Sequence, residues 1–511
     1  MSLPDWLSPL PDAGTQRALD TWAIEERGIP GLELMERAGT GMADLIERHG
    51  PAGGVVVMCG KGNNGGDGFV VARVLRERGR EVRVLALASP EAYRGDARTN
   101  LERLSGVEKF LRGSLDGAAV IVDAILGTGF SGEVREPYAG AIEAINASDA
   151  LIVACDVPSG VDASTGEVAG SAVRADLTVT FHAAKPGLWI SPGKSHAGSV
   201  HVVDIGIPPG GPGDPDIGLI TERSTDGVPR RGSDSTKFAA GSVLVCGGSA
   251  GLTGAVCMAC ESAMRGGAGY VTALVPEAVA LVCDIRLLEV MTMALPESDG
   301  ALAPTAVQTV LDRAQRADAL VLGPGLGRAE ATARFARELA AQLPLPLLLD
   351  ADGLNAHAGE LPRLARRSAP TVLTPHAGEL GRLLQRESSE IGAHRLAGVR
   401  EAAQRAEAVV VLKGDDTLVA EPSGRVAVNP GNAPALATAG SGDVLSGLVG
   451  AYLAKGMDAF HAACAAVFVH AAAGRAAAAE IGAEGVIASD VIAALPKSLP
   501  PRSLAAPPGR E

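Results

Sequence analysis

The sequence is poor in aromatic residues, in cysteine and in positive charge. Phe, Trp and Tyr make up 3% of the 511 residues, so a core has to be built mainly from Ala, Val, Leu and Gly. Seven cysteines are too few and too irregularly spaced for a disulfide scaffold. The 45 basic side chains are outnumbered by 59 acidic ones, giving a net charge of −14. This balance argues against a nucleic-acid partner held through its phosphates.

Long apolar runs are also missing. No stretch approaches the ~18 to 20 uninterrupted apolar residues of a membrane helix, and residues 1–14 lack the basic start and apolar centre of a signal peptide. The Ala-rich residues 460–480 are interrupted by His461, His470 and Arg475, which predicts a buried helix. With 47% hydrophobic residues, we expect a cytoplasmic protein of two or three domains that binds no membrane.

The C-x-x-C pair formed by Cys257 and Cys260 lies in an apolar run without a second pair or a His cluster. We therefore interpret it as two thiols on a helix rather than as a metal site.

Helical spacing and strand-like runs alternate along the chain. Residues 15–47 predict two helices broken at 28–31, and we expect them to serve an oligomer contact. Short β-branched runs then alternate with helical patterns, which predicts an α/β fold with parallel sheets covered on both faces. The predicted strands are 55–58, 82–85, 119–122, 151–154 and 177–180, and then 242–246, 270–274, 319–322, 347–350, 371–374 and 409–412.

A domain boundary is predicted near residues 210–235. Residues 206–213 read Gly-Ile-Pro-Pro-Gly-Gly-Pro-Gly, which sustains neither helix nor strand, and a polar stretch follows. We expect one α/β domain over 1–213 and a second over 228–503, with a loose tail from residue 500.

A glycine-rich loop, Gly-Lys-Gly-Asn-Asn-Gly-Gly-Asp-Gly at 60–68, connects the first predicted strand to a helix. Its G-x-G-x-x-G pattern would let the backbone approach a pyrophosphate at a helix N-terminus. The acidic residue that holds the adenine ribose in dehydrogenases is missing, because residues 86–89 read Ala-Leu-Ala-Ser. An ordinary NAD-dependent dehydrogenase is therefore disfavoured.

Polar residues also follow two later strands of this domain, at Asp123 and at Asp156 with Ser159. Strand ends converge in a parallel sheet, so these side chains can meet Asn64 in one crevice. Their oxygens suit a hard cation, and a remaining carboxylate could transfer protons. The alternative for each Asp is a helix cap or a turn residue.

These three segments together resemble the N-terminal domain of NAD(P)H-hydrate epimerases, over roughly residues 15–210. The resemblance implies a Rossmann-like three-layer domain that interconverts the R and S forms of the coenzyme hydrated at C6. It implies that Asp156 touches the ring as acid/base and that potassium is held by Asn64, Asp123 and Ser159. Lys185 could add a charge near the site, but we expect a solvated loop lysine. The implied substrate-binding residues are Asn63, Asn64, Gly65, Gly66, Asp67, Gly127, Thr128, Gly129, Phe130, Ser131, Gly132, Glu133 and Asp156.

The second half carries features that suit phosphoryl transfer. Gly-Ser-Gly-Asp at 440–443 opens a helical pattern whose amides could stabilise anionic oxygen, while Asp443 takes a hydroxyl proton. Asp443 alone could equally be a favourable partner of the helix dipole. Lys413 to Thr417 follow a strand and offer an ammonium, backbone and a hydroxyl to phosphates. His376 follows another strand, and no Walker lysine motif is present.

These segments resemble the ribokinase-like ADP-dependent NAD(P)H-hydrate dehydratases, over about residues 230–498. The resemblance implies that ADP, with magnesium on its phosphates, activates the C6 hydroxyl of the S hydrate before elimination. Asp443 would be the base. The chain departs from the family at Thr236 and Phe238, at Ala377 and at Ser441. The implied hydrate contacts are Ala255, Gly325 or Gly327, His376 and Asp443, and the implied nucleotide contacts are Lys413, Gly414, Asp415, Asp416, Thr417 and Gly442.

Two other functions remain open from the sequence. A small-molecule kinase would use the same second domain, but it has no use for a fused domain carrying Asp156. A non-enzymatic scaffold is disfavoured because Asn64, Asp123, Asp156 and Ser159 are all present. The preference for NADH or NADPH and for ADP or ATP also remains open, as does subunit number in the expected homo-oligomer.

Overall fold

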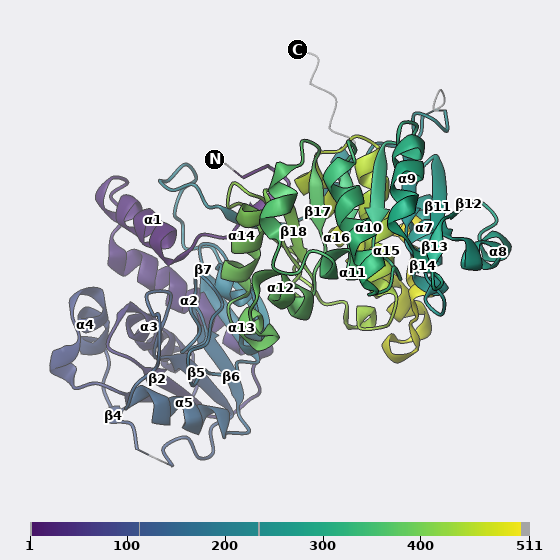
Figure 1. Cartoon of the computed structure of the whole chain (residues 1–511). Helices are drawn as coiled ribbons and strands as arrows, with labels where there is room; N and C mark the ends of the chain where they lie inside the picture. Colours follow the sequence, from purple (N-terminus) through teal and green to yellow (C-terminus); the bar gives the residue numbers. More distant parts are fainter. Residues whose placement is uncertain (1–2, 112, 233–235, 502–511) are drawn as a thin grey trace. The chain divides into compact units, whose positions relative to one another are not determined.

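Alternating strands and helices gather into two large sheets (Figure 1). The first is parallel, as the sequence predicted, and the second is parallel except at one edge. The computed structural model describes residues 3–111, 113–232 and 236–501. The first unit comprises Pro9–Ile217 with Leu3, and the second comprises Pro4–Ser8 and the chain from Gly218 onward. The division falls within the linker region expected from the sequence. The predicted tail lies largely outside the described residues.

The sheet of the first unit has seven parallel strands in the order β4-β3-β2-β5-β6-β7-β8. All five strands predicted here are present, and the two missed strands are the short or exposed edge strands. The strands are β2 (Val55–Cys59), β3 (Val82–Ala86), β4 (Val107–Lys109), β5 (Val120–Ala124), β6 (Leu151–Cys155), β7 (Leu177–Phe181) and β8 (Ser199–Val203).

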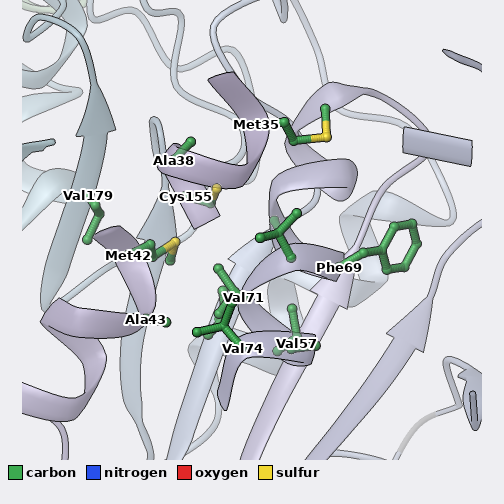
Figure 2. Close-up of a cluster of buried hydrophobic side chains, with 14 of the residues drawn as sticks. Met35, Ala38, Met42, Ala43, Val57, Phe69, Val71, Val74, Cys155 and Val179 are labelled. Carbon is green, nitrogen blue, oxygen red and sulfur yellow. The ribbon is translucent and has the colours of Figure 1, made fainter. Parts of the chain in front are cut away.

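Helices cover both faces of this sheet because successive strand residues point to opposite sides. On one face, Val57 and Cys155 pack with Met42 of α2 and Val71 of α3 (Figure 2). On the other face, Met58 packs with residues of α5. The result is the predicted three-layer arrangement. The helices are α1 (Ala13–Glu25), α2 (Gly31–His49), α3 (Asn63–Glu77), α4 (Gly95–Glu102), α5 (Tyr138–Asn146) and α6 (Lys194–Ala197).

Two helices precede the sheet, as residues 15–47 predicted. Asp12 caps α1 by accepting a hydrogen bond from the Thr15 amide at 2.7 Å. Gly28 has a φ of +71° and breaks the helical path before Pro30 caps α2.

The second unit contains an eleven-stranded sheet in the order β1-β9-β20-β19-β18-β17-β16-β15-β10-β11-β12. The six strands predicted for this half form its parallel centre, and β19 and β20 add an antiparallel edge. The strands of this unit are β1 (Leu7–Pro9), β9 (Ile217–Ile220), β10 (Ser242–Cys246), β11 (Tyr270–Pro276), β12 (Met291–Leu295), β15 (Ala319–Leu322), β16 (Leu347–Leu349), β17 (Thr371–Leu373), β18 (Val409–Leu412), β19 (Leu418–Ala420) and β20 (Val426–Val428), with β13 (Glu297–Ser298) and β14 (Ala301–Leu302) as a separate hairpin.

The first residues of the chain belong to this second sheet, which the sequence did not predict. β1 lies next to β9, and the Trp6 ring stacks on His461 with 4.6 Å between ring centroids. A strand of three residues has too little periodicity to be seen in a sequence.

Two sets of packed helices accompany this sheet. Helix α16 carries the predicted apolar segment; it is long and apolar enough to cross a membrane, but 67% of its most apolar window is buried within the fold. Cys257 and Cys260 are buried on α7, as predicted. One set is α7 (Thr253–Arg265), α15 (Ser441–Ala454), α16 (Ala459–Ile481) and α17 (Ala488–Ser498); the other is α9 (Val307–Ala314), α10 (Glu330–Gln342), α11 (Ala351–Asn355), α12 (Ala377–Leu384) and α14 (Arg395–Ala406), with α8 (Glu277–Arg286) and α13 (Ser388–Ala393) beside them.

Candidate active sites

A cavity of about 550 Å³ opens at the carboxyl ends of the strands in the first unit. Helix α1 contributes Gln16 and Asp20 to its wall, although the sequence suggested only an oligomer contact for this helix. Eight of the residues predicted to bind the first substrate line the cavity: Asn63, Asn64, Asp67, Gly127, Thr128, Gly129, Phe130 and Asp156.

The glycine-rich loop brings the start of α3 close to neighbouring backbone. A Cβ on Gly65 would lie 1.8 Å from the carbonyl oxygen of Gly60, and one on Gly66 would lie 2.7 Å from the Met35 sulfur. The backbone contact leaves room only for glycine at position 65, whereas a side chain at position 66 would displace the end of the Met35 side chain. Ser131, Gly132 and Glu133 are exposed and are not among the described residues that line the cavity.

Asp123 and Ser159 meet at the carboxyl ends of β5 and β6. The Ser159 hydroxyl donates to Oδ1 of Asp123 at 2.6 Å, and the Ser159 amide donates to Oδ2 at 2.8 Å. Burial raises the pKa of the Asp123 carboxyl to about 6, although these hydrogen bonds oppose the rise.

Asn64 lies against the loop that follows Asp123. A Cβ on Gly127 would lie 3.1 Å from Cγ of Asn64, and the Leu126 amide donates to the Ser159 hydroxyl at 2.8 Å. The Oδ1 and Nδ2 atoms of Asn64 are buried and have no hydrogen-bond partner among the described residues. An unsatisfied amide oxygen beside a buried carboxyl and hydroxyl fits a hard cation such as potassium.

Lys185 contradicts the expectation of a solvated loop lysine. Its side chain is 1% exposed, and its Nζ atom donates to Oδ1 of Asp156 at 2.7 Å, to the Thr180 hydroxyl at 2.8 Å and to the Phe181 carbonyl at 2.9 Å. The sequence did not predict this because a loop lysine is usually exposed, whereas here the loop after β7 places Lys185 in the wall of the cavity.

Asp156 is held as an anion at the end of β6. Burial alone would favour its neutral form, but the Lys185 ammonium and the donors of Thr128 lower the pKa of this carboxyl below its ordinary value. The Thr128 amide and hydroxyl both donate to Oδ2. Asp156 also has a φ of +68°, a sparsely populated conformation for a residue other than glycine.

Two further carboxyls line the same cavity, and their pKa values are raised rather than lowered. Burial and the nearby Asp156 raise the pKa of Asp67 well above its ordinary value, and burial also raises the pKa of Asp20. The cavity therefore combines one carboxyl whose pKa is lowered with two whose pKa is raised.

In the second unit, Lys413 lies between two acidic side chains. Its Nζ atom is 2.9 Å from Oδ1 of Asp350 and 3.7 Å from Oε2 of Glu379. Neither Asp350 nor Glu379 was predicted to be a site residue. Asp350 follows β16 directly, the same signal that marked Asp123 and Asp156, and Glu379 occupies the first turn of α12.

Asp443 and Gly442 occupy the first turn of α15, as the sequence predicted. Gly440 precedes the helix with a φ of +88°, and a Cβ on Gly442 would lie 3.4 Å from the Lys413 nitrogen. Burial, reinforced by Asp350, raises the pKa of Asp443 to about 7. At that pKa the carboxyl can both accept and release a proton near neutral pH.

The loop after β18 is fixed by its own side chains. Asp416 forms a buried ion pair with Arg395 at 2.9 Å, and the Thr417 hydroxyl donates to the Gly414 carbonyl at 2.6 Å. Asp415 accepts a hydrogen bond from the Asn432 amide at 3.0 Å. Both acidic side chains of the loop thus have structural partners within the fold and shape the loop.

His376 caps the start of α12. Its Nδ1 atom accepts hydrogen bonds from the amides of Gly378 at 2.9 Å and Glu379 at 3.3 Å. Burial lowers the pKa of His376, which favours a neutral ring that is half exposed. Its Nε2 atom lies 3.6 Å from Oε1 of Glu379, and the half-exposed ring leaves His376 accessible to a ligand.

Ala255 and Gly325 lie together, as the proposed hydrate contacts require. Gly325 has a φ of +63°, and a Cβ placed on it would lie 3.2 Å from Cβ of Ala255. Gly327 is held by Asp352, whose Oδ2 accepts from its amide at 3.1 Å. A cavity of about 440 Å³ adjoins these elements, lined by Gly254 and Ala439 among others, but none of the predicted site residues is among the described residues that line it.

Two families match the two units. The family described as YjeF-related protein N-terminus matches residues 31–187, and the family described as NAD(P)H-hydrate dehydratase matches residues 243–497. The chain is 41% identical over 498 residues to a bifunctional NAD(P)H-hydrate repair enzyme of Moorella thermoacetica, with 94% of each chain covered. It is 40% identical over 520 residues to one of Salinibacter ruber, with 96% of each covered.

A similar solved structure is that of an ADP/ATP-dependent NAD(P)H-hydrate dehydratase from Bacillus subtilis, co-crystallized with ATP and Mg²⁺. It is 29% identical, covers 55% of this chain and 96% of its own, and has a TM-score of 0.48.

Proposed function

The chain belongs to the bifunctional NAD(P)H-hydrate repair enzymes, with an epimerase domain followed by an ADP/ATP-dependent dehydratase domain, and we propose that Asp156 and Asp443 carry the two reactions. The observation that carries this assignment is the state of the two carboxyls. Asp156 is held ionised beside Lys185 in one cavity, and Asp443 has a pKa of about 7 beside Lys413 in the other unit.

In the epimerase domain, Asp156 accepts the proton of the C6 hydroxyl while the C6–N1 bond breaks, its electrons staying on N1 and C6 becoming a carbonyl carbon. N1 then attacks the other face of that carbonyl, the C6–N1 bond forms again, and Asp156 returns the proton to the oxygen. Lys185 and Thr128 keep Asp156 ionised and fixed in place. Asp67 lines the same cavity, and burial raises the pKa of its carboxyl well above the ordinary value, which suits this side chain to a role as hydrogen-bond donor to the substrate. The amides at the start of α3, around Asn63 and Asn64, face the anionic pyrophosphate of the coenzyme.

Potassium suits the site formed by Asn64, Asp123 and Ser159. The unsatisfied amide oxygen of Asn64 and the raised pKa of Asp123 support this proposal. A cation would give the Asn64 oxygen a partner and would stabilise the ionised form of the Asp123 carboxyl. A bound potassium ion would add a fixed positive charge at the ends of β5 and β6. The Ser159 hydroxyl holds the loop after β5 in place by accepting a hydrogen bond from a backbone amide of that loop.

In the dehydratase domain, the C6 hydroxyl oxygen of the S hydrate attacks the terminal phosphorus of ADP while Asp443 takes the hydroxyl proton. A new O–P bond forms, the bond between the two phosphoryl groups breaks, and AMP leaves. Orthophosphate then leaves from C6 with its bonding electrons, a proton leaves C5, and the ring double bond of NAD(P)H is restored. Magnesium on the nucleotide phosphates would lower their charge, and the surplus of carboxylates around Lys413 favours such a cation.

The residues proposed to hold the nucleotide are Lys413, Gly442 and the loop to Thr417. Ala255, Gly325 and His376 are proposed to contact the hydrate, supported by the closeness of Ala255 to Gly325 and by the half-exposed ring of His376. The role of Gly327, and of Ser131, Gly132 and Glu133 in the first domain, stays a prediction.

The location and assembly of the protein are also proposals. We propose a cytoplasmic homo-oligomer that acts on small molecules rather than on nucleic acid or membranes, supported by the net charge of −14.

Incubating the protein with hydrated NADH and ADP tests the function. NADH absorbance should recover as orthophosphate appears in equal amount. A stable phosphorylated product would instead identify a small-molecule kinase.

A further inference from the structure

Asp350 joins the two parts of the second site that carry chemistry. Its side chain is 2% exposed, and its two oxygens have different partners. Oδ1 accepts a hydrogen bond from Nζ of Lys413 at 2.9 Å, and Oδ2 accepts one from the hydroxyl of Ser446 at 2.8 Å. Lys413 follows β18, whereas Ser446 lies on α15, the helix that begins with Asp443. One buried carboxylate therefore ties the nucleotide loop to the helix of the base.

On the basis of the dehydratase function proposed above, we propose that Asp350 is a positioning residue for phosphoryl transfer. It fixes the Lys413 ammonium where the nucleotide phosphates arrive, and it sets how readily Asp443 takes up a proton.

The position of Lys413 requires such a partner. Its ammonium lies against the first turn of α15, since a Cβ on Gly442 would be only 3.4 Å from Nζ. A cation is disfavoured at the positive end of a helix dipole, and a lysine side chain has many rotamers. Asp350 at 2.9 Å and Glu379 at 3.7 Å offset the repulsion and restrict the ammonium to one place. Lys413 therefore awaits the nucleotide already oriented.

The charges around Asp443 come from four neighbouring elements. Asp350 follows β16, Lys413 follows β18, Glu379 and His376 belong to the start of α12, and His470 lies on α16. Burial lowers the pKa of both histidines, so both favour neutral rings. The remaining charges are two carboxylates and one ammonium, and after burial itself Asp350 contributes most to raising the pKa of Asp443 to about 7.

The substitution Asp350→Asn tests both parts of the proposal. The Lys413 ammonium loses its charged partner, so the KM for ADP should rise about tenfold or more. Removing the negative charge lowers the pKa of Asp443, so the acidic limb of kcat/KM for the hydrate should move to lower pH by roughly half a unit or more. Epimerisation, which belongs to the other unit, should be unchanged.

Ser446→Ala is the matched control. It removes the other hydrogen bond of Asp350 but leaves the carboxylate and its contact with Lys413. The acidic limb should stay at the wild-type pH, and the KM for ADP should change by less than about threefold. If Asp350→Asn does not fold by circular dichroism, Asp350→Glu replaces it: the charge is kept while the ammonium is displaced, so KM should rise without a shift of the limb.

The results separate the inference from the function on which it rests. A folded Asp350→Asn variant whose acidic limb and KM for ADP match the wild type overturns the role of Asp350, as does an Asp350→Glu variant with an unchanged KM. If the wild type shows no nucleotide-dependent dehydration, the proposed function itself fails and the role of Asp350 fails with it.

Discussion

The ammonium nitrogen of Lys185 lies 2.7 Å from Oδ1 of Asp156, and the lysine side chain is almost fully buried. A buried ion pair is stable only while both partners are present, because either charge left alone loses its solvation without compensation. The pair therefore couples the folding of the first unit to the ionisation of its proposed catalytic carboxylate.

Replacing Lys185 with Met should damage both stability and catalysis. Asp156 would be left buried without its cation, so the free energy of unfolding of the first unit should fall by about 3–5 kcal/mol. Chemical denaturation gives this value, and epimerase activity should fall with it. The double variant with Asp156→Asn is the control, since removing both charges should cost less stability than removing the lysine alone. Equal or larger loss in the double variant would contradict the ion pair's role.

Replacing Asp156 with Asn should abolish epimerisation and leave coenzyme-hydrate binding measurable. The amide keeps the shape of the side chain but cannot accept the hydroxyl proton, so the rate should fall about 10² to 10⁴-fold. Exchange of the R and S forms, followed by chiral chromatography above the rate without protein, measures the first effect, and calorimetry measures the second. Retained turnover would refute the assignment of Asp156.

The dehydratase should gain activity as the pH rises through about 7. Asp443 acts as a base only when ionised, and burial followed by the effect of Asp350 raises its pKa to about 7. Below that pH the protonated fraction grows, so kcat/KM for the S hydrate should fall about tenfold for each unit of pH. A pH profile with saturating ADP measures this. A rate that stays flat down to pH 5 would exclude Asp443 as the base.

Potassium should stabilise the first unit more at pH 8 than at pH 5. The folded-state pKa of Asp123, about 6, lies above the ordinary value of 3.8, so folded protein binds more protons between these values. Ionising the buried carboxyl thus costs roughly 3 kcal/mol as the pH rises from about 4 to above 6, and a bound cation would offset this cost.

Thermal unfolding in potassium or sodium chloride at equal ionic strength tests the cation site. The Tm in potassium should exceed that in sodium at pH 8, and Asp123→Asn should remove most of the difference. An equal difference at both pH values, or one that survives Asp123→Asn, would place the potassium effect elsewhere.

Much of the fold followed from periodicity and strand ends alone. The apolar runs at 55–58 and 409–412 are buried strands, as their β-branched residues predicted. Of the polar residues directly after such runs, Asp156 lines the first cavity, Asp123 bonds to Ser159, and Lys413 pairs with Asp350. The edge strands β4 and β8 were missed because exposed edges do not need apolar residues on both faces.

The side-chain partners were less predictable. Burial of Lys185 depends on the path of a loop, which local sequence does not encode, and the partnership of Asp350 with Ser446 joins residues 96 positions apart. Asp416 follows shortly after Lys413, which is proposed to hold the nucleotide, yet the Asp416 carboxylate pairs with Arg395. Sequence spacing thus predicts which strand ends meet, whereas three-dimensional packing decides which carboxylate is ionised.

The most direct measurement follows the R and S hydrates separately while ADP is supplied or withheld, in the wild type and in the Asp156→Asn and Asp443→Asn variants. The account predicts that the wild type exchanges epimers without ADP and converts both to NADH with it. Asp443→Asn should exchange epimers without forming NADH, and Asp156→Asn should consume the S form and leave the R form at its uncatalysed rate of exchange. Dehydration without nucleotide, or clearance of the R form by Asp156→Asn at the wild-type rate, would contradict it.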